Sequence, residues 1–213
     1  MDVDTLSSRL AGLPIPQIQY HDVIGSTNDA ALDWANKGAP DGCLVAADQQ
    51  THGRGRLGRT WVTRPGSALA FSLIIRPTQA ELEHISLFSP LGALAAAQAL
   101  DEMLGLASEI KWPNDILLNR RKAAGILVET SWQGDLPLGL VMGIGINVAE
   151  DAVPPADSLM FPAASVETAA GRQVDRWELM RSVLSAVFEW RPRIASDSFR
   201  QSWEKRLAFK GEW

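Results

Sequence analysis

The sequence predicts one domain of the α/β or α+β class. Segments with the features of strands alternate with segments with the features of helices, and no internal repeat or low-complexity tract interrupts them. The 213 residues are 46% hydrophobic and 21% charged, which suffices for one sizeable core and leaves no length for a second large domain. We therefore expect residues 1–213 to form a single domain.

The first half of the chain predicts three strands and a helix. The helix has Ser26 or Thr27 as its cap, Asp29 in its first turn and Gly38 at its end. A loop rich in glycine and arginine, residues 50–61, connects the second and third strands. The expected strands are residues 18–23 (IQYHDV), 43–49 (CLVAADQ) and 68–77 (ALAFSLIIRP).

The second half predicts a helix, a group of strands and a final helix. Residues 89–104 are rich in small residues and have helical character, and residues 138–148 form a buried strand. Between them, residues 109–130 give three strands separated by turns at Pro113 and Asn119. Apolar side chains then recur at helical spacing, which indicates packing and not a site: Trp177, Met180, Val183, Leu184 and Val187.

Composition excludes several classes of protein. A formal net charge of -5 argues against a protein that coats nucleic acid. The single cysteine, Cys43, excludes an intramolecular disulfide and a multi-cysteine metal site, and its apolar neighbours predict a small buried side chain. The N-terminus is acidic, and no run of about 18 apolar residues occurs. We therefore expect a cytoplasmic protein with neither a secretion signal nor a membrane span.

The loop QTHGRGRLGRTW, residues 50–61, is the unusual feature of the chain. Gly53, Gly55 and Gly58 match the pattern GxGxxG, but the dinucleotide fingerprint needs a helix to begin inside it, and TWVTRPGS follows instead. Kinase motifs and the Walker pattern are absent, and a nucleic-acid-binding RGG tract needs many more repeats. A solvated basic loop remains the alternative to a ligand-binding loop.

The arginines of this loop suit a ligand with more than one anion. Arg54, Arg56 and Arg59 each offer a planar fork to a carboxylate or phosphate. Two unit charges of like sign a few ångströms apart repel by about 4 kcal/mol at an effective dielectric near 20, unless cations intervene. The glycines at 125, 143 and 145 would leave backbone open to a ligand, although close packing explains each of them equally well.

Five blocks together carry a family resemblance. They are STN (26–28), the loop 50–61, KWPNDI (111–116), KAAGILVE (122–129) and GIGIN (143–147). Their order and spacing resemble the biotin protein ligases, with a weak continuation to WEKRL (203–207). The RRxSGGG block of the related lipoate ligases is absent.

This resemblance implies an α+β fold in which helices flank a mixed β-sheet, as in class II aminoacyl-tRNA synthetase cores. It also implies a biotin–[biotin carboxyl-carrier protein] ligase. Such an enzyme joins biotin and MgATP to form biotinoyl-AMP, and then transfers biotin to a lysine on the biotin carboxyl-carrier domain of a carboxylase. The implied cofactors are ATP with Mg²⁺, with no metal site in the protein itself, and biotin is the substrate.

The resemblance also implies roles for individual residues. Arg56 and Lys122 are expected to bridge biotin's carboxylate and the α-phosphate, and so to be catalytic. The expected biotin-binding residues are Ser26, Thr27, Asn28, Gln50, Gly53, Arg54, Gly55, Arg56, Lys122, Gly125 and Gly145. The expected ATP-binding residues are Arg56, Arg59, Trp61, Asn114, Lys122 and Asn147.

Alternatives to these roles stay open for three residues. Asn28 has an equally good structural role in the first helical turn. Asp115 is expected to organise its turn, and Lys111 is expected to be solvated or to act behind the site.

The chain departs from the family pattern at both ends. Only 25 residues precede Ser26, too few for the DNA-binding domain of some members, so we expect an enzyme that binds no nucleic acid. The family's small C-terminal β-domain is absent or cut off after residue 213. A homodimer stays open, because family members are often dimers. The competing hypothesis is a non-catalytic biotin-binding or regulatory module.

Overall fold

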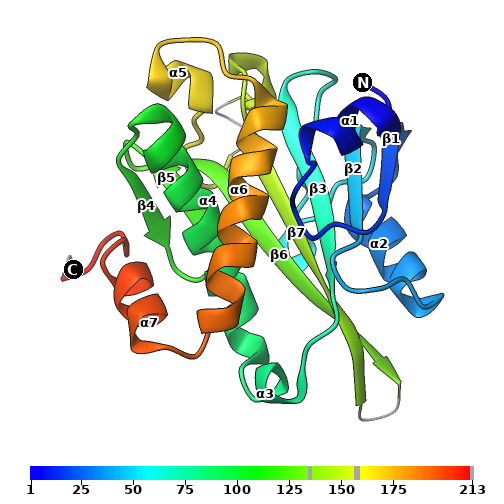
Figure 1. Ribbon diagram of the computed structural model, residues 1–213. Coiled ribbons are helices and arrows are strands. Elements are labelled where there is room, and N and C mark those ends of the chain that lie inside the picture. Colours follow the sequence, from blue (N-terminus) through cyan, green and yellow to red (C-terminus); the bar gives the residue numbers. More distant parts are fainter. Residues whose placement is uncertain (134–135, 156–158, 212–213) are drawn as a thin grey trace.

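The computed structural model describes residues 1–133, 136–155 and 159–211. Its described part holds one seven-stranded sheet in the order β1-β2-β3-β7-β6-β5-β4, with helices packed against it (Figure 1). The pair β1 and β2 is parallel, and every other pairing in the sheet is antiparallel. This mixed sheet with flanking helices confirms the α+β fold.

The bounds of the elements are as follows. The strands are β1 (Ile18–Ile24), β2 (Leu44–Gln50), β3 (Ala68–Ile75), β4 (Ser108–Lys111), β5 (Asp115–Leu118), β6 (Arg121–Gln133) and β7 (Leu136–Asn147). The α-helices are α1 (Val3–Arg9), α2 (Thr27–Asn36), α3 (Gln79–Leu82), α4 (Phe88–Leu104), α5 (Val166–Ala170), α6 (Arg176–Trp190) and α7 (Asp197–Glu204). Short 3-10 helices are η1 (Arg56–Gly58), η2 (Ile85–Leu87), η3 (Glu150–Ala152) and η5 (Arg191–Arg193).

The sequence predicts all seven strands and the helices α2, α4 and α6. It does not predict α1, α3, α5 or α7. The four-residue α3 buries no side chain, and α1, α5 and α7 each bury one and so lack an apolar period: Leu6, Val166 and Phe199, respectively. Their polar N-caps, Asp2, Ser165 and Ser196, are the local signal that could have found them.

Alternation along the strands divides the sheet into two faces. On one face, residues such as Leu73 and Met142 join the main core with α4 and α6. On the other face, their neighbours Ile74 and Val141 pack with α2 in a smaller cluster that includes Cys43. Burial raises the pKa of the Cys43 thiol, which fits the predicted small, unreactive side chain. Helix α2 covers this face mainly at β2, β3 and β7. It leaves β4, β5 and part of β6 uncovered.

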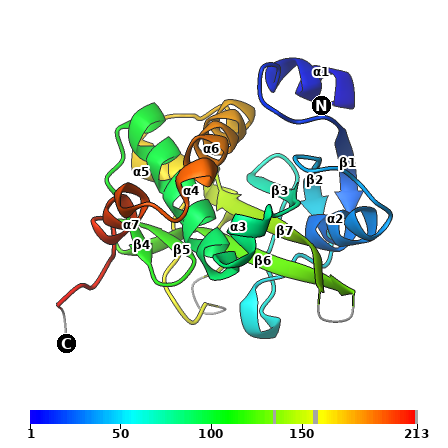
Figure 2. The ribbon, with the colours of Figure 1, turned by 60° about the horizontal axis from the view of Figure 1, so that its bottom comes forward.

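Two helices form the thick layer of the core. Helix α4 buries eleven residues, most of them alanine or leucine, and its alanine and glycine surface lets it approach the sheet closely. A Cβ at Gly92 would lie 3.0 Å from Ile126 Cγ2. The apolar stripe predicted for residues 177–187 is buried on α6, as expected for packing. In Figure 2 the sheet separates α4 and α6 from the loop that follows β2.

The far edge of the sheet is paired with a distant segment of the chain. The N–H of Ile110 on β4 donates to Arg206 O at 2.7 Å, and the N–H of Ala208 donates to Ile110 O at 2.9 Å. This short parallel bridge satisfies edge groups of β4. Within the described ranges, no helix is both long enough and apolar enough to cross a bilayer.

The start of α6 is fixed by Asp175. Its carboxylate accepts hydrogen bonds from the N–H groups of Trp177 (2.9 Å) and Glu178 (3.3 Å), and it pairs with Arg9 of α1 at 2.7 Å. Partial burial alone would raise the carboxyl pKa, but the hydrogen bonds from Arg9 and the two N–H groups outweigh it. The pKa of Asp175 is therefore held below its ordinary value of 3.8.

Asp175→Ala is expected to lower the free energy of unfolding by about 1 kcal/mol at pH 7, because it removes the cap. Since the folded-state pKa is depressed, the charged cap stabilises the fold fully above about pH 5, and this stabilisation is lost as the pH falls through the folded-state pKa. Urea denaturation of both proteins at pH 7 and pH 3 measures the difference. An equal difference at the two pH values would contradict a charged cap.

Candidate ligand-binding site

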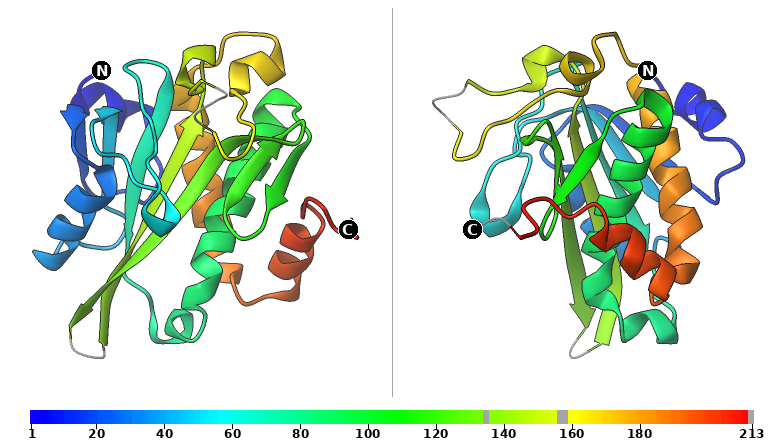
Figure 3. Two further views of the ribbon diagram at one scale, coloured as in Figure 1. Left: turned by 180° about the vertical axis from the view of Figure 1, so that it is seen from behind. Right: turned by 90° about the vertical axis from the view of Figure 1, so that its left-hand side faces the viewer.

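A trough of small residues crosses the face of the sheet beside α2. In the antiparallel register, Gly145 on β7 lies opposite Ala70 on β3 and Gly125 on β6, and Gly125 lies opposite Asp115 on β5. The next row places Gly143 opposite Ser72 and Leu127. Because period-two alternation sends these positions to one face, the glycines leave that face hollow. Helices α4 and α6 cover the opposite face of the sheet (Figure 3).

Loops roof this trough and enclose a cavity of about 600 Å³. The roof comes from the loop after β2, the turn between β4 and β5, and the loop after β7. With one exception, every site residue predicted from the sequence lines this cavity. The exception is Gly53, which is buried in the adjoining loop, where a Cβ would overlap the carbonyl oxygen of Trp61.

The loop after β2 folds back on itself as an irregular hairpin, which we call the lid loop (residues 51–61). The N–H of Gly55 donates to Arg59 O at 2.7 Å, and the N–H of Trp61 donates to Gly53 O at 2.8 Å. The tip turns at Leu57 and Gly58, both with positive φ (56° and 72°). A left-handed backbone is costly for leucine, so the tip of the loop is strained at Leu57. The side chain of Leu57 faces solvent.

Trp61 closes the lid loop against the trough. Its ring lies on Gly145 and Gly125, since a Cβ at Gly145 would overlap the ring and one at Gly125 would lie 3.4 Å from Cζ3. The ammonium group of Lys122 lies 5.6 Å from the ring centroid. The indole Nε1 is buried without a hydrogen-bond partner in the structure, so a donor is available inside the site.

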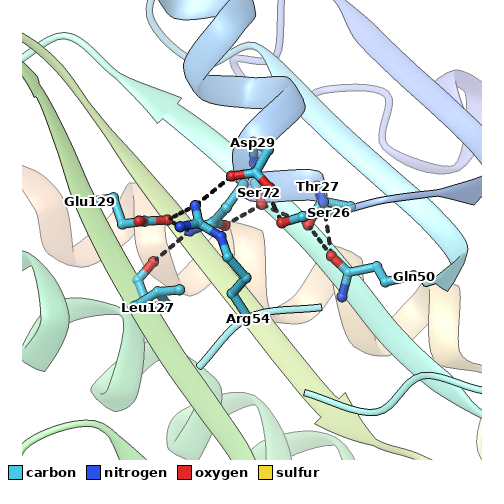
Figure 4. Close-up of polar contacts among 9 residues, drawn as sticks. Ser26, Thr27, Asp29, Gln50, Arg54, Ser72, Leu127 and Glu129 are labelled. Carbon is cyan, nitrogen blue, oxygen red and sulfur yellow. Dashed lines mark hydrogen bonds and ion pairs between the residues drawn. The ribbon is translucent and has the colours of Figure 1, made fainter. Parts of the chain in front are cut away.

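One end of the cavity, which we call the amide end, holds a polar network (Figure 4). Ser26 caps α2, and the next residue, Thr27, donates its N–H to Gln50 Oε1 at 2.8 Å. The Thr27 and Gln50 side chains also lie 3.0 Å apart, and Ser72 Oγ lies 2.8 Å from Thr27 Oγ1. Gln50 Nε2 donates to Thr63 at 3.4 Å. This end therefore presents oriented amide and hydroxyl groups to a ligand.

Asn28 lies beneath these groups and is only 4% exposed. Its Nδ2 donates to Glu129 Oε2 (2.8 Å) and Leu127 O (3.3 Å), and its Oδ1 accepts from Ser72 at 2.6 Å. A Cβ at residue 143 would overlap Asn28 Oδ1, so β7 must carry glycine at this point. The amide of Asn28 is thus held by groups of β3 and β6, and not within the first turn of α2 as the structural alternative had it.

Arg54 joins the lid loop to the same end. Its Nη2 lies 2.6 Å from Asp29 Oδ1 and 2.6 Å from Glu129 Oε2, as Figure 4 shows. Asp29 belongs to α2 and Glu129 to β6, so a single guanidinium bridges the lid loop, a helix and the sheet.

At the opposite end, Lys122 pairs with Asp115 at 2.6 Å. Its backbone is held from outside the sheet, because its N–H donates to Pro162 O (2.7 Å) and its carbonyl accepts from Ala164 N (2.9 Å). Asn147 Nδ2 donates to Ala164 O at 3.2 Å and so supports the same segment. The Lys122 ammonium is thereby fixed over the trough.

The turn between β4 and β5 supplies the remaining polar wall. Asn114 donates its Nδ2 to Ile126 O at 2.7 Å, and its Oδ1 accepts from Arg56 Nη1 at 3.3 Å. Lys111, expected to be solvated or behind the site, lines the cavity with its Nζ 3.9 Å from the ring centroid of Phe161. Arg59 is exposed at the rim.

The charges of the lining favour an anionic ligand. Two of the basic side chains form ion pairs. Arg54 pairs with both Asp29 and Glu129, and Lys122 pairs with Asp115. No ion pair is formed by Arg56, Arg59 or Lys111 in the part of the chain that the structure describes. Among the described residues, the charged side chains that line the cavity are Arg54, Arg56, Arg59, Lys111, Lys122 and Asp115. Across the same residues, no group of three or more His, Cys, Asp and Glu could hold a metal ion.

Sequence reasoning does not assign four of the residues that build the site. Ser72, Glu129 and Phe161 come from segments expected to pack or left unassigned, and Asp29 was expected only as a first-turn acid. Ser72 and Glu129 could have been found from the alternation of the strands, because each is a polar or charged residue on the face of the sheet that carries the glycines. The roles predicted for the other residues remain predictions, since the structure describes their positions and not a ligand.

These features define a protein with the fold of the biotin protein ligase catalytic core. The chain belongs to the biotin/lipoate A/B protein ligase family, whose model matches residues 20–147. It is 37% identical over 200 residues to the biotin–[acetyl-CoA-carboxylase] ligase of Paracoccus denitrificans, a match that covers 88% of this chain and 79% of the relative.

A second relative is the bifunctional ligase/repressor BirA of Bacillus subtilis, 41% identical over 174 residues and 82% of this chain. The chain spans about half of that protein's length, 53%. Among solved structures, it resembles a biotin protein ligase from Aquifex aeolicus in complex with biotin and ATP, with a TM-score of 0.77 and 28% identity over 92% of this chain and 80% of the other. It also resembles a biotin protein ligase from Leishmania major in complex with biotinyl-5-AMP, with a TM-score of 0.74 and 26% identity over 92% and 83% of the two chains.

Gly143→Ala is expected to lower the free energy of unfolding by about 1–3 kcal/mol, because the added methyl group overlaps the buried Asn28 amide. Gly25→Ala is the matched control, since a Cβ there meets nothing within 4 Å. Urea denaturation measures both variants. A Gly143→Ala protein as stable as the control would show that Asn28 and β7 can separate without cost.

Proposed function

We propose that this chain activates biotin with ATP to biotinoyl-AMP and transfers the biotinoyl group to a lysine of a carrier protein. The observation that carries the proposal is the convergence of oriented amides and hydroxyls at one end of a single cavity and of basic groups at the other. Biotin has the matching shape, since it carries a polar urea at one end and a carboxylate at the other.

The amide end suits the urea of biotin. A urea offers one carbonyl acceptor and two N–H donors, and a buried urea left unpaired would be costly. In our proposal Ser26, Thr27 and Gln50 satisfy these groups, with the backbone of Gly53 and Arg54 closing over them. Gly125 and Gly145 leave room for the apolar ring and chain along the trough.

The basic end suits the reacting groups of the first step. A carboxylate oxygen of biotin attacks the α-phosphorus of ATP, the bond from that phosphorus to the bridging oxygen breaks, and pyrophosphate leaves. Both partners are anions, so Arg56 and Lys122 in this proposal hold the carboxylate against the α-phosphate and stabilise the added charge. Lys122 then exchanges part of its pairing with Asp115 for the substrates.

Other residues would place the nucleotide. We propose that Arg59 and Asn114 meet the phosphates, that Trp61 offers its ring face to adenine and that Asn147 reads an adenine edge. In this proposal Mg²⁺ enters as part of the MgATP substrate.

The second step consumes the mixed anhydride. A neutral lysine amine attacks the acyl carbon, the bond to the phosphate oxygen breaks, AMP leaves, and the nitrogen loses a proton as the amide forms. We propose that the amine belongs to a biotin carboxyl-carrier domain of a carboxylase and that the reaction takes place in the cytoplasm. The proposal includes no nucleic-acid partner and leaves a homodimer open.

The test is biotin-dependent exchange of labelled pyrophosphate into ATP without any carrier, with lipoate and octanoate as control acids. Exchange with biotin alone is expected, because adenylation is reversible and needs only the cavity. Biotin binding by calorimetry without exchange would instead support the non-catalytic module, and exchange driven equally by lipoate would overturn the choice of substrate.

Arg56→Gly is expected to release biotinoyl-AMP into solution, because the lid loop loses a cation that spans the anhydride and its contact with Asn114. Biotin attached to lysines of a bystander protein should rise at least tenfold relative to wild type. Arg172→Gly, remote from the lid loop, is the control for loss of an arginine. Unchanged labelling of the bystander would show that Arg56 does not retain the intermediate.

A further inference from the structure

We propose that Glu129 is a positioning residue that sets the order of donors and acceptors at the amide end and holds the lid loop against it. This inference rests on the proposed function only for the identity of the ligand. Its starting point is the two contacts of one oxygen atom, since Glu129 Oε2 lies 2.8 Å from Asn28 Nδ2 and 2.6 Å from Arg54 Nη2. Asn28 belongs to the floor of the cavity, and Arg54 belongs to the lid loop that covers it.

The floor contact fixes the orientation of the Asn28 amide. An ionised carboxylate only accepts hydrogen bonds, so the NH₂ group of Asn28 must face Glu129 and its oxygen must face Ser72. The carbonyl of Leu127, at 3.3 Å from Nδ2, imposes the same orientation. Because Asn28 is buried, a reversed amide would leave its carbonyl oxygen facing the oxygens of Glu129 and Leu127, acceptor against acceptor.

The orientation of the Asn28 amide then determines the direction of the next hydrogen bond, which joins it to Ser72. The Ser72 hydroxyl has one proton and lies 2.6 Å from Asn28 Oδ1, which can only accept, so that proton is required there. The Thr27 hydroxyl lies 2.8 Å from Ser72 Oγ and donates to Gln50 Oε1 at 3.0 Å. Gln50 Oε1 also accepts the Thr27 N–H at 2.8 Å, so the oxygen of the Gln50 amide faces Thr27 and its NH₂ group faces Thr63. The charge of Glu129 thus orders donors and acceptors from Asn28 to Ser72, next to the groups of Thr27 and Gln50.

The roof contact holds the lid loop. Arg54 pairs with Asp29 as well as with Glu129, but the Asp29 side chain is 57% exposed and that of Glu129 is 25% exposed. Exposed ion pairs contribute little, because water and salt screen them, so the Glu129 arm is the stronger of the two. A variant that neutralises Glu129 should therefore loosen the lid loop more than one that neutralises Asp29.

The first experiment tests the roof contact without any ligand. Limited digestion with trypsin, followed by mass spectrometry, measures the rate of cleavage after Arg54, Arg56 and Arg59 in the lid loop. Glu129→Gln keeps the shape of the side chain and removes its charge, and we expect cleavage about tenfold faster than in wild type. Asp29→Asn, the matched control, is expected to stay within about threefold. Equal rates in Glu129→Gln and wild type would overturn the roof contact.

The second experiment tests the floor contact. In Glu129→Gln the new amide can donate, so only the longer contact with Leu127 O still favours one orientation of Asn28, and biotin affinity measured by calorimetry is expected to fall at least tenfold. In pyrophosphate exchange the change should appear in KM for biotin, with kcat altered less than threefold, since Glu129 touches no reacting atom. An equal fall in kcat and kcat/KM, with KM unchanged, would overturn the positioning role.

Controls separate these outcomes from loss of fold and from failure of the proposed function. Glu129→Asp keeps the charge and should restore protection of the lid loop to within about threefold of wild type, whereas continued rapid cleavage would indicate a purely steric role and overturn the proposal. Urea denaturation of each variant identifies a protein that is globally unfolded. If wild type binds no biotin, the proposed function fails, and the trypsin rates still decide whether Glu129 holds the lid loop.

Discussion

The candidate site depends on the absence of side chains along β7. Asn28 reaches its buried position because Gly143 has no Cβ, and Trp61 reaches the sheet because Gly145 has none. The first contact orders the hydrogen bonds of the amide end, and the second brings the lid loop down over the trough. The packing of two side chains on two glycines therefore sets both the floor and the roof of the cavity, and the register with Ser72, Leu127 and Gly125 follows from the same strand.

Charge is distributed unevenly around this frame. At the amide end the carboxylates of Asp29 and Glu129 balance Arg54, while at the other end Lys122 is balanced by Asp115 alone and Arg56 extends toward Asn114. A neutral polar group and an anionic group can therefore occupy one cavity without competing for the same partners. The chain has a net charge of -5 overall, so the excess of basic residues in the lining is a local property of the lid loop and of strand ends.

Much of the fold and part of the site follow from sequence patterns. Alternation and caps predict the strands and the three longest helices, and the Gly/Arg loop and glycine strands indicate where a ligand would lie. Alternation gives the face of a residue and not its partner on the next strand, so the link between Asn28 and Glu129, 101 residues apart, is invisible before the register is known. The short helices α1, α5 and α7 escape prediction because a single buried side chain makes no period.

The position of Trp61 gives the cavity an optical reporter of its own. The indole rests on backbone, has a buried and unpartnered Nε1, and has an ammonium group 5.6 Å from its ring. Its emission is therefore sensitive to any molecule that displaces the ring, accepts its N–H or draws Lys122 away. The chain has eight tryptophans, of which Trp61 and Trp112 line the cavity in the described part of the chain, and Trp112 is 71% exposed whereas the Nε1 of Trp61 is buried. Occupancy of the site should thus be readable from intrinsic fluorescence without a label.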